Sequence, residues 1–201
     1  PPWKIKLDDE AKMTEIKSEW QKEDPEMIFL QGVRGAIPGA DLQYEVLAKI
    51  AQLWCSQPSR ILDIGCGDGV PGRFLMNIYP AVHATFVDFS DPMLNAARDQ
   101  LNDAKRAVLV KADITTPAWL KDVRGEAQFD IIVSGFAIHH KPDARKKELY
   151  AEVLDLLAPG GIFLNLDHVA SLTSSGEELF SDFFIDNLHR FHVKEAPNKT
   201  R

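Results

Sequence analysis

Three glycines behind an acidic residue are the part of this sequence best suited to binding chemistry. Asp63 lies in an apolar run, and Gly65, Gly67 and Gly69 follow it at alternate positions. Glycine has no Cβ and accepts a positive φ, so a turn of this kind lets a ligand lie against bare backbone. Residues 70–79 then have the pattern of a helix. A strand, a glycine turn and a helix N-terminus together predict a nucleotide-type site.

Polar side chains also follow three later apolar runs. Asp88 and Asp113 each come at the end of one, and a carboxylate such as that of Asp88 can accept two hydrogen bonds from a ribose diol. His139 and His140 follow the last of these three runs, residues 129–134. An imidazole there can take a proton from a hydroxyl or hold a substrate carboxylate. Because ligands of open α/β sheets bind beyond the carboxyl ends of the strands, these residues predict one shared site.

The elements that must position these residues alternate along the chain. Apolar runs predict strands, and helical spacing predicts the helices between them. This order predicts an α/β fold, Rossmann-like and doubly wound, with a mostly parallel sheet and helices on both faces. The expected strands are 60–64, 83–88, 107–111, 129–134 and 161–167, and the expected helices are 8–24, 42–54, 70–79, 91–102, 117–122, 143–157 and 175–190.

Composition narrows the classes of function. A length of 201 residues fits one domain, and the net charge of −7 argues against a general grip on nucleic acid or on an anionic membrane. No apolar run is long enough to span a membrane. Cys55 and Cys66 lack the spacing of metal ligands and indicate no disulfide framework, so we expect reduced thiols in a cytoplasmic protein and no metal site.

The ordered set of motifs resembles the class I S-adenosylmethionine-dependent methyltransferases of the small-molecule type. The set comprises the glycine turn, Asp88, Asp113, residues 134–140 and residues 157–161, and the resemblance covers roughly residues 40–170. It implies S-adenosyl-L-methionine as the cofactor and a small-molecule acceptor with an oxygen or nitrogen nucleophile. Family sheets of this kind end in two further strands, which residues 192–201 are too few and too polar to supply.

The resemblance also implies which residues hold the methionine and ribose parts of the cofactor. Gly65, Gly67 and Gly69 would pass beneath the methionine part, and Asp63 would lie near its ammonium group. Asp88 would hold the ribose hydroxyls. A plainer alternative for Asp88 is an acid favoured by the dipole of the following helix.

The adenine and the methyl group are assigned in the same way. Phe89 and Met93 would contact the adenine faces, Asp113 would accept from its amino group, and the backbone N–H of Ile114 would reach a ring nitrogen. Ser134 would line the floor beside the cofactor. Two plainer alternatives stay open: Met93 as a core residue, and Asp113 as the cap of a short turn.

The acceptor side is less defined. Arg34 and Phe136 would line the acceptor pocket, and His139 or His140 would serve as the catalytic base. A structural imidazole that binds a neighbouring loop is the alternative for each histidine. Chemistry on exocyclic base amines is not expected, because residues 134–137 lack the Asn- or Asp-Pro-Pro-Tyr sequence of those enzymes.

Three other functions stay open. Residues 67–72 also fit the G-x-G-x-x-G fingerprint of an NAD(P)-dependent oxidoreductase, although Asp63 is a poor neighbour for a diphosphate. Residues 37–39 and 176–180 are similar to the carboxy-S-adenosylmethionine synthase group of tRNA modification. The third alternative is a non-catalytic cofactor-binding subunit of a partner enzyme.

Three parts are expected along the chain: a helical lid at 1–40, the cofactor-binding core at 41–170, and a C-terminal helix and tail at 171–201. Ser175 and Glu178 predict a capping box at the start of the last helix. Its wide aromatic face suits core packing, a substrate lid or the contact surface of a homodimer.

Overall fold

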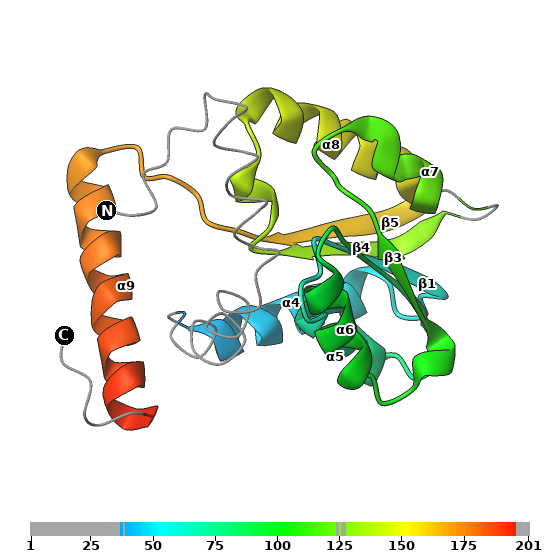
Figure 1. Ribbon diagram of the computed structural model, residues 1–201, viewed down its shortest axis with the longest axis horizontal. Coiled ribbons are helices and arrows are strands. Elements are labelled where there is room, and N and C mark those ends of the chain that lie inside the picture. Colours follow the sequence, from blue (N-terminus) through cyan, green and yellow to red (C-terminus); the bar gives the residue numbers. More distant parts are fainter. Residues whose placement is uncertain (1–36, 38, 124, 126–127, 196–201) are drawn as a thin grey trace.

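A five-stranded parallel sheet forms the centre of the computed structural model (Figure 1). The structure describes residues 37, 39–123, 125 and 128–195. The strand order is β3-β2-β1-β4-β5, so the direction of winding reverses between β1 and β4. All four pairings are parallel. The strands are β1 (Arg60–Ile64), β2 (His83–Asp88), β3 (Ala107–Lys111), β4 (Phe129–Gly135) and β5 (Leu157–Leu166).

Helices cover both faces of this sheet, as Figure 1 shows. One layer contains α4 (Ala40–Trp54), α5 (Val70–Ile78) and α6 (Asp91–Asp99), and the other contains α7 (Leu120–Val123) and α8 (Asp143–Leu156). The last helix, α9 (Ser174–Glu195), stands apart from both layers. Short 3-10 turns complete the chain: η2 (Ala104–Arg106), η3 (Pro117–Trp119) and η4 (Ile138–His140). The predicted Rossmann-like α/β fold is confirmed.

Each face of the sheet has its own apolar core. Successive residues of β1 and β4 enter opposite cores: Ile61 and Ile131 pack in the first, and Leu62 and Ile132 in the second. All four side chains are fully buried. A sheet covered on both faces needs apolar residues at every position, which is why these strands read as continuous apolar runs.

Most element boundaries agree closely, and the largest difference among the strands is at β5. The predicted strand begins at 161, but β5 begins at Leu157, which pairs with Phe129. Pairing then resumes at Ile131 and Ile162, so the intervening residues bulge out of the ladder. Gly160 adopts a φ of 79° in this bulge, and its carbonyl accepts a hydrogen bond of 3.0 Å from the Trp54 indole. The bulge lets a proline and two glycines lie within a strand.

Two further elements differ in detail. The helix predicted at 117–122 is divided into η3 and α7, and α9 is longer than the expected 175–190. Within the described residues, no strand follows β5, in line with the expected lack of C-terminal edge strands. The predicted helix at 8–24 lies outside the described residues, and so does almost all of the lid at 1–40. The division into three parts stays a prediction.

Over the part of the chain that the structure describes, no helix combines the length and apolar character that a membrane span requires.

Candidate functional site

The glycine turn joins β1 to α5 at the reversal of the strand order. Gly65, Gly67 and Gly69 have φ values of 63°, 54° and 79°, all in the left-handed region. Residues with a Cβ adopt this region at a cost of roughly 1–2 kcal/mol each, so the turn requires its three glycines. The backbone N–H of Cys66 donates to the Val87 carbonyl of β2 at 2.9 Å, which ties the turn to the neighbouring strand.

Asp88 locks the turn from the end of β2. Its Oδ2 accepts the backbone N–H of Gly67 at 2.8 Å, and its Oδ1 accepts the backbone N–H of Ser90 at 2.9 Å. Burial raises the pKa of Asp88, although the hydrogen bonds from Ser90 and Gly67 oppose this rise. Each carboxylate oxygen has a second lone pair, so Asp88 retains the acceptor capacity that a ribose diol requires.

Asp63 joins β1 to the first turn of α5. The side chain is fully buried, and its Oδ2 accepts the backbone N–H of Gly72 at 2.8 Å. A Cβ on Gly72 would lie 2.9 Å from the same Oδ2 and would collide with the Phe86 ring. Asp63 therefore holds the N-terminus of α5 against the turn, and the ammonium contact implied by the resemblance stays a prediction.

The end of β3 is held from two sides. Oδ1 of Asp113 accepts the backbone N–H of Thr115 at 2.9 Å, so the alternative role of Asp113 as a turn cap is present. The Ile114 carbonyl accepts a hydrogen bond from Nε of Arg145 at 2.9 Å. Arg145 also donates two hydrogen bonds of 2.7 Å to the Glu152 carboxylate. This buried network anchors the segment proposed to face the adenine.

The two residues expected against the adenine differ in burial. Phe89 is half-buried, whereas the Met93 side chain is buried. Ser90 is the N-cap of α6, and its Oγ accepts the backbone N–H of Met93 at 3.3 Å. Phe89 is thus accessible to a flat ring, and the alternative of Met93 as a core residue fits its burial.

Ser134 ties the ends of β4 and β1 together. Its side chain is fully buried, and Oγ donates to the Ile64 carbonyl at 2.8 Å. The hydroxyl proton is therefore used within the protein. A role of Ser134 in holding the cofactor stays a prediction.

The segment after β4 lies directly against the glycine turn. A Cβ on Gly65 would collide with the Cβ of Ala137, so this glycine also permits the close approach of the two loops. Phe136 is half-buried and adopts a φ of 55°. Its backbone N–H donates to the Leu166 carbonyl at 2.7 Å, which helps to hold this unfavourable conformation. The strain lies where the acceptor is expected.

The two histidines occupy different surroundings. His139 Nδ1 contacts Oδ1 of Asp167, and the backbone N–H of His139 donates to Oδ2 of the same carboxylate at 3.0 Å. The rings of His139 and His140 are 3.9 Å apart between centroids, and that of His168 lies 6.3 Å from His139. Burial, together with the charges of the neighbouring His139 and Lys141, lowers the pKa of His140 to about 4. His140 is therefore neutral at pH 7.

Sequence reasoning missed three residues of this region: Arg145, Lys141 and Asp167. Lys141 is buried, its Nζ lies 3.4 Å from the Thr115 hydroxyl, and its charge lowers the pKa of Asp88 against the effect of burial. Position after a strand end was a usable signal for Asp167, because it directly follows β5. Nothing in the local pattern indicated the buried guanidinium of Arg145. The remaining predicted residue, Arg34, lies outside the described residues.

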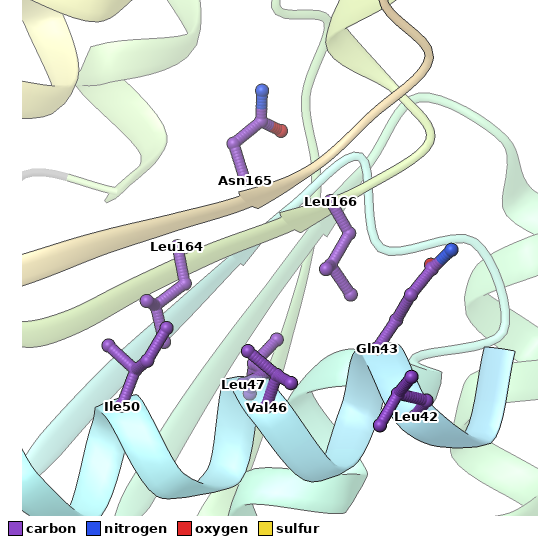
Figure 2. Close-up of a pocket in the computed structure, with 8 residues that line it drawn as sticks. All are labelled: Leu42, Gln43, Val46, Leu47, Ile50, Leu164, Asn165 and Leu166. Atoms are coloured by element: carbon purple, nitrogen blue, oxygen red, sulfur yellow. The ribbon is translucent and has the colours of Figure 1, made fainter. Parts of the chain in front are cut away.

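An apolar groove of about 340 Å³ lies between α4 and β5 (Figure 2). Leu42, Val46 and Ile50 of α4 face Leu164 and Leu166 of β5 across it, as Figure 2 shows. None of the predicted cofactor or catalytic residues lines this groove. The groove ends at Asn165 and Leu166, directly before Asp167, and so it adjoins the region of the histidines.

Two curated relatives resemble this chain over most of its length. A carboxy-S-adenosyl-L-methionine synthase from Aeromonas hydrophila is 26% identical over 164 residues, which are 79% of this chain and 63% of the relative. A demethylmenaquinone methyltransferase from Leptospira interrogans is 31% identical over 124 residues, covering 62% and 48% respectively. The chain spans about half to two thirds of the length of the first curated relatives it matches.

Solved structures share the fold. The structure of the DhpI-SAM-HEP complex superposes with a TM-score of 0.59 at 20% identity and covers 84% of this chain and 71% of that protein. A family model for a methyltransferase domain matches residues 61–161, from β1 into β5. That match takes in the glycine turn, Asp88, Asp113 and both histidines. The chain belongs to the methyltransferase domain family, which confirms the resemblance to the S-adenosylmethionine-dependent methyltransferases.

Proposed function

We propose that this chain is an S-adenosylmethionine-dependent methyltransferase that moves a methyl group to an oxygen or nitrogen nucleophile of a small molecule. The observation that carries the proposal is the hydrogen bond of 2.8 Å between the Gly67 N–H and Oδ2 of Asp88. It couples the turn beneath the methionine part of the cofactor to the carboxylate that receives the ribose. One ligand therefore meets both elements in a fixed relative position.

Charge around the turn favours a cationic cofactor. Asp63, Asp68 and Asp88 are all buried there. Burial raises the pKa of the Cys66 thiol within the turn, and these three carboxylates raise it further, which reveals their combined negative field. A sulfonium and an ammonium are attracted by that field, whereas a diphosphate is repelled. The nicotinamide alternative is therefore disfavoured, although residues 67–72 match its fingerprint.

The chemistry requires little more than alignment from the protein. The cofactor supplies a methyl group on a sulfonium, and the residues of the chain hold the two reactants in line. Such positioning accounts for roughly 7–11 kcal/mol of a barrier. In this proposal the glycine turn and Asp88 fix the cofactor, Phe89 and residues 113–114 fix the adenine, and Phe136 separates the cofactor from the acceptor.

Calorimetric titration tests the cofactor directly. S-adenosylhomocysteine, the product form of the cofactor, is expected to bind, whereas NAD⁺ and NADP⁺ are not. Binding of a nicotinamide cofactor without binding of S-adenosylhomocysteine would contradict the proposal. Transfer of a labelled methyl group to small acceptors then separates an enzyme from a non-catalytic subunit.

A second candidate is a carboxy-S-adenosylmethionine synthase-like activity. It is favoured by the length of the match to the Aeromonas relative, which is the longest of those described above, and by residues 37–39 and 176–180. The carboxylated cofactor is heavier than S-adenosylmethionine by a carboxyl group. Mass spectrometry of ligand extracted from the purified protein distinguishes the two: carboxylated cofactor supports the second candidate, and unmodified cofactor supports methyl transfer.

A further inference from the structure

The Asp167 carboxylate is held by several donors at the end of β5. Oδ2 accepts the backbone N–H of His139 at 3.0 Å, and Oδ1 accepts the backbone N–H of His168 at 2.9 Å. Oδ1 also contacts Nδ1 of the His139 ring. One carboxylate therefore holds both the backbone and the ring of His139. Because its side chain is only 8% exposed, Asp167 has little freedom to turn away.

The charge of Asp167 determines which nitrogen of His139 carries the proton. Burial by itself raises the pKa of Asp167, but hydrogen bonds from the His139 ring, the His168 N–H and Asn165 hold it below its usual range. An ionised carboxylate only accepts hydrogen bonds, so the facing Nδ1 is the protonated nitrogen of a neutral ring. Nε2 then has a free lone pair, which is the state of a general base.

The position of His139 fits a base beside the reacting methyl group. It lies in η4, one turn after β4, and Ala137 of the same segment packs on Gly65 of the glycine turn. Its side chain is 26% exposed, so an acceptor can reach the ring. His140 is the weaker candidate, since its lowered pKa of about 4 makes it a poor acceptor of protons.

From this geometry we infer that His139 is the general base of the reaction, that Asp167 is its positioning residue, and that the acceptor presents a hydroxyl group. The inference rests on the proposed methyltransferase function. In the step, the hydroxyl oxygen attacks the methyl carbon, the O–CH₃ bond forms and the S–CH₃ bond breaks. The hydroxyl proton passes to Nε2 of His139, and Asp167 stabilises the resulting imidazolium. The products are a methyl ether and S-adenosylhomocysteine.

The need for a base distinguishes a hydroxyl from other acceptors. A carboxylate is already ionised at neutral pH, and an amine that binds in its neutral form attacks through its own lone pair and loses its proton afterwards. A hydroxyl is a weak nucleophile until its proton is removed. A base held in one tautomer by a buried carboxylate therefore serves a hydroxyl acceptor better than a carboxylate or a neutral amine, neither of which needs it for the attack.

Nuclear magnetic resonance of the full chain labelled with ¹⁵N-histidine tests the dyad without an acceptor. In the unmodified protein, neutral His139 is expected to carry its proton on Nδ1. Asp167→Asn should convert this resonance to a mixture of both tautomers. His168→Ala is the matched control, because it retains the backbone N–H that reaches Asp167 and removes only a ring that meets His139 edge-on. The tautomer of His139 should therefore stay the same even where its chemical shift moves. A proton on Nε2 in the unmodified protein would overturn the inference.

Two activity measurements complete the test. His139→Ala is expected to lower kcat by about 10²–10⁴-fold, with an unchanged affinity for S-adenosylhomocysteine, and Asp167→Asn should cause a large part of the same loss. Methyl-¹³C S-adenosylmethionine offered with a small-molecule extract should give a labelled methyl ether. A methyl ester or an N-methyl product as the His139-dependent product would overturn the hydroxyl assignment. Failure to bind S-adenosylhomocysteine at all would instead contradict the proposed function.

Discussion

Two neighbouring regions at the carboxyl ends of the strands differ in how much they depend on contacts between side chains. The cofactor edge, residues 63–72 and 86–93, is held by backbone N–H groups that donate to Asp63 and Asp88. The acceptor edge, residues 134–140 and 165–168, also has backbone N–H groups that donate to a carboxylate, that of Asp167, and adds a contact of the His139 side chain and the left-handed backbone of Phe136. Binding through backbone groups suits a cofactor that is the same whichever acceptor is methylated. The side chains of the acceptor edge can be substituted to suit a particular acceptor.

The two edges meet at two contacts. The Cβ of Ala137 occupies the space that a side chain on Gly65 would need, and the Ser134 hydroxyl donates to the Ile64 carbonyl. A change at the steric contact of Gly65 and Ala137 is therefore expected to affect both edges, whereas loss of the Ser134 hydrogen bond should mainly lower stability, and a change within one edge should leave the other intact. This difference makes the comparison testable.

The largest effect is expected from Gly65→Ala. The new methyl carbon would lie 2.4 Å from the Ala137 Cβ, and the backbone would retain an unfavourable φ of 63°. Strain of about 1–2 kcal/mol and overpacking of about 1–3 kcal/mol should lower stability together. Calorimetry should show S-adenosylhomocysteine affinity reduced tenfold or more, and the ¹⁵N signals of His139 should shift as well.

Gly160→Ala is the matched control for this variant. Gly160 has a similar φ of 79°, but no atom lies within 4 Å of the position of its Cβ. The free energy of unfolding of this variant should fall only by the strain of about 1–2 kcal/mol. Its binding of S-adenosylhomocysteine should be fully retained. Equal losses of affinity in the two variants would show that backbone strain, and not the contact between the edges, causes the effect.

Asp88→Ala should disrupt the cofactor edge alone. It removes the acceptor of two backbone N–H groups and the proposed partner of the ribose hydroxyls. Loss of hydrogen bonds to a charged group should weaken S-adenosylhomocysteine binding by about 1.5–3 kcal/mol, while the tautomer of His139 stays unchanged. Asp143→Ala is the control, since this exposed acid pairs with Lys146 within α8, outside the cofactor edge. Unchanged affinity in a folded Asp88 variant would refute the ribose assignment.

The cofactor edge could be predicted from the sequence because its signals are local. Gly65, Gly67 and Gly69 must each adopt a positive φ within five residues, and Asp88 ends the adjacent strand of the sheet. The constraint on backbone conformation thus appears directly as a choice of residue type. The strand boundaries followed for the same reason, since a sheet buried on both faces requires continuous apolar runs.

The acceptor edge could not be predicted to the same depth because its partners are distant in sequence. His139 and Asp167 are 28 positions apart, and their pairing depends on the bulge that sets where β5 ends. The predicted capping box of α9, Ser175 with Glu178, was also wrong. The cap is Thr173, whose Oγ1 accepts from the N–H of Gly176 at 3.1 Å, while Glu177 reaches back to the N–H of Ser171 at 2.8 Å. Several residues near the start of this helix have capping side chains, so the sequence pattern alone did not identify the cap.

The smallest effect is expected from Ser134→Ala, which probes the second contact between the edges. The variant loses one neutral hydrogen bond, that of 2.8 Å to the Ile64 carbonyl, so the free energy of unfolding should fall by about 0.5–1.5 kcal/mol. Because the hydroxyl proton is used within the protein, S-adenosylhomocysteine affinity should change less than twofold. Ser181→Ala removes a similar bond to a backbone carbonyl within α9 and should leave affinity unaltered. A clear loss of affinity in the Ser134 variant alone, with stability retained, would instead place this hydroxyl in direct contact with the cofactor. The cofactor edge would then extend into β4, and Ser134 would belong to it and not to the acceptor edge.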